Sequence, residues 1–112
     1  MIDWHSHVLP KMDDGSGSVE ESLKLILMQQ QQGADKIIAT PHFLANDESV
    51  DLFLERRKAS FKLLKPNLSD KAPQIILGAE VKYYEGISRL AQLKSLRIEG
   101  SNLLLLEMPF SK

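Results

Sequence analysis

The chain has 112 residues, 43% of them hydrophobic and 26% charged, which is typical of one small globular domain rather than a disordered segment. Fourteen Lys and Arg residues against 15 Asp and Glu residues leave a net charge of −1, without the broad basic face that nucleic-acid binding requires. The absence of cysteine excludes disulfides and thiolate zinc sites, and it fits a reducing, cytoplasmic location.

The N-terminal part of the chain predicts a strand followed by a helix. Residues 2–7 form the strand, and a turn-rich stretch over 10–17 separates it from the helix. The helix begins at Ser18, because Ser18 and Glu21 match a capping box, and Gly33 is suited to end it. Apolar residues at helical spacing predict its buried face: Val19, Leu23, Ile26 and Leu27.

A second strand and a second helix follow. Residues 36–40 form a compact apolar strand that stops at Pro41. Asp47 is the predicted cap of a helix that runs to Lys65, where Pro66 ends it. The same spacing rule predicts the buried face of this helix: Val50, Phe53, Leu54, Phe61 and Leu64.

The C-terminal part predicts two more strands. Residues 74–77 form the third, and residues 81–84 either extend it or return from it. A short third helix is expected over 87–91, and four leucines at 103–106 form the fourth strand. That run is far shorter than the ~20 apolar residues that span a bilayer, and residues 1–5 lack signal-peptide features. The alternation of strands and helices predicts an α/β fold built from parallel βαβ units.

Each predicted strand ends in a side chain that can bind a metal ion, and the set includes all three histidines of the protein. In chain order these residues are His5, His7, His42, Glu80 and Glu107. The carboxyl ends of parallel strands meet at one rim of the fold, where sites are assembled from several strands. The sequence therefore predicts that these five groups converge around one cationic centre.

The histidines also have a plainer interpretation. His5 and His7 lie two apart on a strand, so both rings can face one ion while Ser6 points away. Two ordinary histidines near a turn would nevertheless show the same spacing. His42, next to Pro41, could be a solvated loop residue.

The acidic residues leave alternatives open as well. Glu80 and Glu107 end buried strands and need a partner, which could be an arginine, a lysine or backbone N–H groups instead of a metal. Asp13 and Asp14, in the loop after the first strand, fit either a metal site or simple turn chemistry.

A mixed set of imidazoles and carboxylates suits Zn, Mn or Fe better than Ca. A carboxylate can bridge two such ions, and a pair ~3.5–4 Å apart clamps the attacking and leaving oxygens of a phosphoryl displacement. The chemistry that this set of residues fits best is metal-assisted hydrolysis.

At these residues the chain resembles the polymerase and histidinol phosphatase (PHP) superfamily. More narrowly, it resembles the bacterial capsule-associated, metal-dependent protein-tyrosine phosphatases of that superfamily. The resemblance covers essentially the whole chain and is carried by ordered segments at 2–10, 13–16, 38–42, 78–81 and 105–110. Lys11 and Met12 depart from the Gly-apolar pair expected there, at positions that are not ligands.

The resemblance implies a distorted (β/α) barrel with two or three Mn, Fe or Zn ions that hydrolyses phosphotyrosine on proteins of capsule or exopolysaccharide export, such as their tyrosine kinase. In this implied site Glu80 bridges the ion of the N-terminal histidines to a second ion, and an aspartate, Asp14 rather than Asp13, shares a third ion with His42. The implied metal ligands are His5, His7, Asp14, His42, Glu80 and Glu107.

Family members continue past the fourth strand and add a histidine, an Asp-x-His pair and a phosphate-binding arginine, none of which follows here. The arginines of this chain are predicted to lie on helix surfaces or in loops: Arg56, Arg57, Arg89 and Arg97. Residues 1–112 are therefore expected to be the N-terminal portion of a PHP-type domain, either a fragment or a short relative. Its partial barrel of about four parallel strands should bind metal weakly and show little phosphatase activity.

An incomplete barrel leaves a strand edge unpaired and the leucines at 103–106 exposed, which predicts a homodimer or larger assembly. Two other functions stay open. One is a histidinol-phosphatase-like enzyme acting on a small molecule, and the other is a non-catalytic remnant that associates with itself. The Asp-Asp-Gly loop at 13–15 and the Glu-Met-Pro-Phe segment at 107–110 favour the tyrosine phosphatase.

Overall fold

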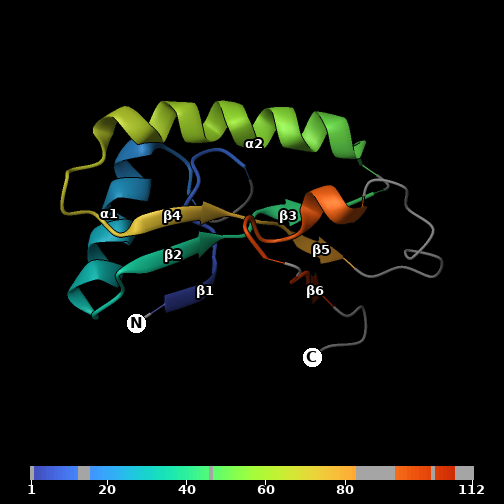
Figure 1. The fold of residues 1–112 in the computed structure, drawn as a ribbon. Helices are drawn as coiled ribbons and strands as arrows, with labels where there is room; N and C mark the ends of the chain where they lie inside the picture. Colours follow the sequence, from blue (N-terminus) through green and yellow to red (C-terminus); the bar gives the residue numbers. More distant parts are fainter. Residues whose placement is uncertain (1, 13–15, 46, 83–92, 102, 108–112) are drawn as a thin grey trace.

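A computed structural model gives two short parallel sheets, one continuing into the other, with the long helix α2 lying along both (Figure 1). The structure describes residues 2–12, 16–45, 47–82, 93–101 and 103–107. No helix in these ranges is long and apolar enough to cross a membrane. The fold class is α/β with parallel strands, as the sequence predicts.

The first sheet has the strand order β1-β2-β4 and contains β1 (Ile2–Ser6), β2 (Lys36–Ala39) and β4 (Gln74–Leu77). All of its strands are parallel, and β2 pairs with β4 without a break in register. The central strand β2 is the most buried, since its last three residues are at most 2% exposed. These strands match the first three predicted from the sequence to within one residue.

The second sheet has the order β3-β5-β6 and contains β3 (His42–Phe43), β5 (Glu80–Lys82) and β6 (Leu105–Glu107), again all parallel. The prediction of four strands is therefore wrong, because the described residues hold six strands in two sheets. Strands of two or three residues are too short to give a periodic signal in the sequence. Residues 81 and 82 do not extend β4, since they belong to β5, a separate strand that begins at Glu80, and residues 83 and 84 lie outside the described residues.

The last strand also begins later than its apolar run. The Leu103 carbonyl accepts a hydrogen bond from the Ile98 N–H (2.9 Å), and the Leu103 N–H donates to Ser101 Oγ (3.0 Å). These bonds use the backbone groups of Leu103 in a turn, so β6 starts at Leu105. Before this turn lies a 3-10 helix, η3 (Leu93–Leu96). The third helix expected over 87–91 lies outside the described residues.

Helix α1 (Val19–Gln31) follows the predicted start and end closely. Ser18 Oγ accepts from the Glu21 N–H (3.1 Å), whereas the Glu21 carboxylate accepts from the Gly17 N–H (3.1 Å), one residue before the expected partner. Gly33 follows the helix with a φ of 98°, a conformation that glycine adopts without strain. Leu27 was predicted on the buried face but is 52% exposed, because the buried side of α1 is centred on Ser22 and Ile26.

Helix α2 (Val50–Leu64) continues into the 3-10 helix η1 (Lys65–Asn67). The predicted cap Asp47 is wrong, because Ser49 Oγ accepts from the Leu52 N–H (3.1 Å) and α2 begins directly after Ser49. Most of the predicted face packs against the core, with Phe53 fully buried. Its ring meets Phe43 of β3 edge to face, with centroids 5.3 Å apart, which fastens α2 to the second sheet.

Candidate metal centre

The site forms where the first sheet passes into the second. Two residues separate β2 from β3 and two separate β4 from β5, and at each of these two crossings the chain passes from the first sheet to the second. The Gly78 N–H donates to the Ala39 carbonyl (2.8 Å) and the Glu80 N–H to the Pro41 carbonyl (2.9 Å), so the two crossings stay side by side. As a result, His42 and Glu80 are register partners in the second sheet.

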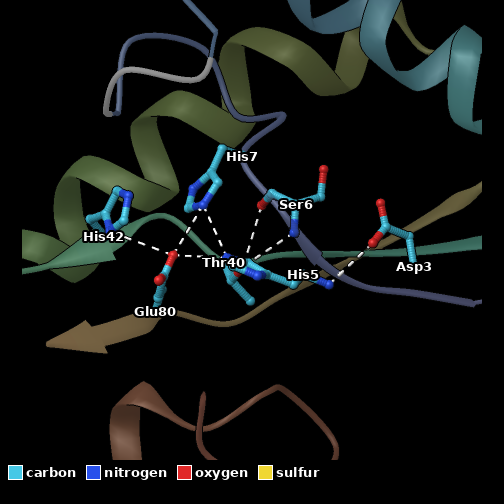
Figure 2. A network of polar contacts seen from close by, with 7 residues as sticks. All are labelled: Asp3, His5, Ser6, His7, Thr40, His42 and Glu80. Carbon is cyan, nitrogen blue, oxygen red and sulfur yellow. Dashed lines mark hydrogen bonds and ion pairs between the residues drawn. The ribbon is translucent and has the colours of Figure 1, made fainter. Parts of the chain in front are cut away.

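The end of β1 is joined to the same junction by Thr40. The Thr40 N–H donates to the Ser6 carbonyl (2.7 Å), and the Ser6 N–H donates to Thr40 Oγ1 (3.2 Å), with both residues buried. Because Ser6 points inward, its neighbours His5 and His7 face the other way, toward the second sheet (Figure 2). This is the orientation that their spacing in the sequence predicts.

The three imidazole rings surround one oxygen of Glu80 (Figure 2). Glu80 Oε1 lies 2.8 Å from His5 Nε2, 3.1 Å from His7 Nε2 and 3.5 Å from His42 Nδ1. The Nε2 atoms of His5 and His7 are 3.1 Å apart, and the rings of His7 and His42 stack with centroids 4.6 Å apart. Four side chains that the sequence singled out therefore lie together.

Burial distinguishes the carboxylate from the rings around it. The Glu80 side chain is 9% exposed, whereas that of His5 is 47% exposed and those of His7 and His42 lie between. A buried carboxylate needs a compensating partner. Among the described residues no arginine or lysine contacts Glu80, so the imidazoles occupy that role and one side of the group stays open to solvent.

A second group shares the same carboxylate. Glu107 stands at the end of β6, next to β5, and one potential ligand atom each from His42, Glu80 and Glu107 lies within 4.8 Å of the others. The same criterion holds for His5, His7 and Glu80. The two groups meet at Glu80, which is the arrangement of a bridging carboxylate between two cation positions.

The donor chemistry of these groups fits divalent cations. Two imidazole nitrogens and a carboxylate oxygen of the first group point at each other across 2.8–3.1 Å. Atoms that share a zinc-like ion at 2.0–2.2 Å in tetrahedral geometry are about 3.3–3.6 Å apart, so these atoms would move apart by a few tenths of an ångström to admit an ion. Imidazole and carboxylate are also the ligands that Zn, Mn and Fe accept, and the sequence has no thiolate that would favour a softer metal.

The predicted ligand Asp14 and its alternative Asp13 lie outside the described residues, so their part stays a prediction. The loop that carries them is anchored on both sides. The Lys11 N–H donates to the Ser16 carbonyl (2.8 Å), and Arg56 Nη2 donates to the Met12 carbonyl (2.9 Å).

One residue that the sequence analysis placed on the surface is buried. Arg57 is 7% exposed on α2, and its Nη1 donates to the Gly78 carbonyl (2.8 Å) at the junction between the sheets. The prediction assigned it to the helix surface because of its charge. Its position could have been found from spacing, since it lies on the same helical stripe as Val50, Phe53 and Leu64.

A pocket of about 300 Å³ opens beside the cluster, between the end of β1 and α1. His5 and His7 are among its lining residues at the end of β1, and Leu25 and Gln29 line it from α1. Its size is at the lower end of the range for small-molecule sites.

Comparisons with known proteins assign the chain to a family. The model of the family described as capsular polysaccharide synthesis, CpsB/CapC, matches residues 1–112. The chain belongs to the CpsB/CapC family. The resemblance to capsule-associated phosphatases inferred from the sequence is thereby confirmed.

Curated relatives in the family carry phosphatase names. The chain is 33% identical over 115 residues to the tyrosine-protein phosphatase YwqE of Bacillus subtilis (strain 168), covering 98% of this chain and 44% of YwqE. It is also 33% identical over 114 residues to the putative tyrosine-protein phosphatase CapC of Staphylococcus aureus, covering 97% of this chain and 43% of CapC.

A solved structure agrees in fold. It comes from crystal structures of YwqE from Bacillus subtilis and CpsB from Streptococcus pneumoniae, described as unique metal-dependent tyrosine phosphatases. The match has a TM-score of 0.70 and 28% identity, and it covers 98% of this chain but 45% of that one. The chain therefore spans less than half the length of these relatives.

Proposed function

We propose that residues 1–112 are the N-terminal portion of a PHP-type, metal-dependent protein-tyrosine phosphatase that acts in capsular or exopolysaccharide synthesis. The substrate in this proposal is phosphotyrosine on a protein, such as a tyrosine kinase of the export machinery. The observation that carries the proposal is the Glu80 carboxylate, buried without an arginine or lysine among its described contacts and shared by two groups of potential metal ligands. The names of the family's relatives supply the reaction class.

The proposed ligands divide between two sheets. His5 and His7 with Glu80 would hold one ion, and Glu107 and His42 with Glu80 would hold a neighbouring one, with Asp14 added from its loop. Bound Mn, Fe or Zn ions would supply Lewis acidity that polarises a phosphate ester and lowers the pKa of nearby water.

The residues of this chain have distinct tasks in that reaction. Glu80 is the most buried of the described ligands, so it would set the spacing of the two groups, while the more exposed His5 would lie where substrate enters. The pocket between His5, His7 and α1 would admit the phosphate group beside the ligands. The remaining length of the relatives is where we expect the further ligands and the phosphate-binding arginine. We therefore expect low activity from these 112 residues alone.

Metal binding by the chain tests the proposal directly. Isothermal titration with Mn²⁺ and Zn²⁺ should show binding, and Glu80→Gln should weaken it by at least the 10–100-fold that loss of a supporting contact costs. Glu55→Gln, on an exposed part of α2, is the matched control and should bind like the unchanged chain. No binding by the unchanged chain, or equal binding by both variants, would refute the site.

Substrate class needs its own assay. With Mn²⁺ present, a phosphotyrosine peptide should be turned over faster than histidinol phosphate or another small phosphomonoester, although slowly in absolute terms. Preference for the small ester would support the alternative of a small-molecule phosphatase. Metal binding with no turnover of either substrate would support a non-catalytic role.

Self-association is part of the same proposal. Leu103 is 53% exposed and Leu106 is 39% exposed, and β6 is an edge strand of its sheet. A second copy that covers this edge would bury these leucines. Light scattering at high protein concentration should therefore give a dimer or larger species, and a Leu106→Lys variant should shift it toward the monomer. A monomer for the unchanged chain would contradict this part of the proposal.

A further inference from the structure

Arg57 is a buried cation that the chemistry described so far does not use. Its guanidinium donates through Nη1 to the Gly78 carbonyl (2.8 Å) and lies over the Phe53 ring, 5.8 Å from the centroid. Burial lowers the pKa of the Arg57 guanidinium, and the negative charge of Glu99 opposes that change. Burying a charged group costs free energy. The hydrogen bond from Arg57 to the Gly78 carbonyl therefore needs an explanation.

That bond ends at the turn that leads into the site. Gly78 lies between β4 and β5 and precedes Glu80 by two residues. Space around it is limited, since a Cβ added there would lie 3.1 Å from the Ile98 side chain and 3.4 Å from that of Thr40. The crossing at Gly78 is thus fixed in three ways: the Gly78 N–H donates to the Ala39 carbonyl, Arg57 donates to the Gly78 carbonyl, and neighbouring side chains pack against the glycine.

The strand before the turn has hydrogen bonds of its own, which do not involve a donor of Arg57. The Leu77 N–H donates to Glu99 Oε1 (3.2 Å), and the Glu99 N–H donates to the Leu77 carbonyl (2.9 Å). Loss of the Arg57 bond would therefore leave β4 in place and release the peptide between Gly78 and Ala79. That peptide sets the direction in which the chain enters β5 and hence where the Glu80 carboxylate lies.

We propose that Arg57 is a positioning residue for Glu80: by holding the Gly78 carbonyl, it keeps the shared carboxylate at the meeting point of the two ligand groups. This inference rests on the proposed metal site. Helix α2 contributes no ligand from the described residues. In this inference it nevertheless helps to set the geometry of the metal centre. Hydrogen bonds behind a ligand typically change metal affinity 10–100-fold.

The test compares two neighbouring cations of α2 in the full chain. Arg57→Met keeps an unbranched apolar side chain beside Phe53 but removes the donor, and Lys58→Met is the matched control. Lys58 is exposed on the same helix. We expect Arg57→Met to weaken Mn²⁺ binding about 10-fold or more. Lys58→Met should leave the affinity unchanged, and Arg57→Lys, which retains a donor, should recover part of the loss.

A second measurement in chelator separates this inference from the metal proposal. Without metal, Arg57→Met should speed hydrogen exchange of the Glu80 N–H by on the order of tenfold while leaving the Ile37 and Ile38 amides of β2 protected. Faster exchange at Glu80 in a chain that binds no metal would uphold the positioning role and reject the metal site. If the methionine variant does not fold, Arg57→Gln, whose amide is too short for the bond, replaces it. A folded variant without the Arg57 bond that binds Mn²⁺ like the unchanged chain would overturn the inference.

Discussion

The two sheets of this molecule differ in strand length, in burial and in how many of the candidate ligands they carry. The first sheet has strands of four or five residues, and Ile37, Ile38 and Ala39 of its central strand are almost completely buried. The second has strands of two or three residues, yet the ends of those strands carry His42, Glu80 and Glu107. Apolar burial stabilises the first sheet. The register of the second sheet places His42, Glu80 and Glu107 near one another.

The difference in strand length shows that the geometry of the site depends on the rest of the fold. Such short strands cannot stabilise themselves, so the second sheet depends on the junction and on α2 for its position. His42 and Glu80 follow closely after the buried strands β2 and β4, and backbone hydrogen bonds of Thr40 and Gly78 connect the strands there. Changes in the core of the first sheet should therefore affect mainly stability, and changes at the strand ends that carry the ligands should affect mainly metal binding.

The largest effect should come from the first sheet. Ile37 is fully buried in β2, and Ile37→Ala should lower the free energy of unfolding by about 2–5 kcal/mol because it removes core contacts and leaves a cavity. Urea denaturation followed by circular dichroism measures this. Leu27→Ala, on the exposed side of α1, should change it by no more than about 0.5 kcal/mol. Equal losses for the two variants would contradict the assigned core.

A substitution at a ligand of the second sheet should leave the fold intact and remove the stabilisation that bound metal provides. At a metal concentration of 100 times Kd, binding should stabilise the unchanged chain by about 2.7 kcal/mol. Glu80→Gln should lose this gain, while its stability in chelator stays within about 1 kcal/mol of the unchanged chain. Thermal unfolding with and without EDTA shows both quantities. If the variant is already unfolded in EDTA, where the unchanged chain is folded, Glu80 is required for the fold itself.

The cap of α2 should have an intermediate effect, since this helix lies along both sheets. Ser49→Ala removes the acceptor for the Leu52 N–H and should cost about 1 kcal/mol of stability. Asp47→Ala is the control, because the structure gives the capping role to Ser49. Chemical denaturation of the pair decides between the two caps, and a larger loss at Asp47 would restore the assignment made from sequence.

The smallest effect is expected at the ion pair of Glu48 and Arg56, whose Oε1 and Nη1 atoms are 2.6 Å apart. The Arg56 side chain is 38% exposed, so Glu48→Gln should cost only about 0.2–1 kcal/mol. The loss should shrink further at high salt, because added ions screen a pair near the surface. Stability curves at two salt concentrations provide the measurement, and a salt-independent loss would argue against an ionic origin.

Much of the first sheet could be predicted because its signals are local. Apolar runs predict β1, β2 and β4, and the Ser18 and Glu21 pair predicts the start of α1. The choice of Asp47 over Ser49 failed, since both residue types cap helices and only the backbone at the helix start decides between them. The second sheet was predicted only in part: the strand at 103–106 and the segment at 81–84 overlap β6 and β5, whereas β3 was missed because a strand of two residues leaves no periodic pattern.

The amino-acid sequence by itself determined which residues are candidates for the site, since imidazoles and carboxylates at the ends of apolar runs are readable from their order. Only the tertiary structure decided how they meet. The chain crosses from one sheet to the other at Thr40 and Gly78, which brings His42 beside Glu80, and a buried Arg57 holds that crossing. Such relations join positions tens of residues apart through hydrogen bonds and packing, and no local pattern in the chain encodes them.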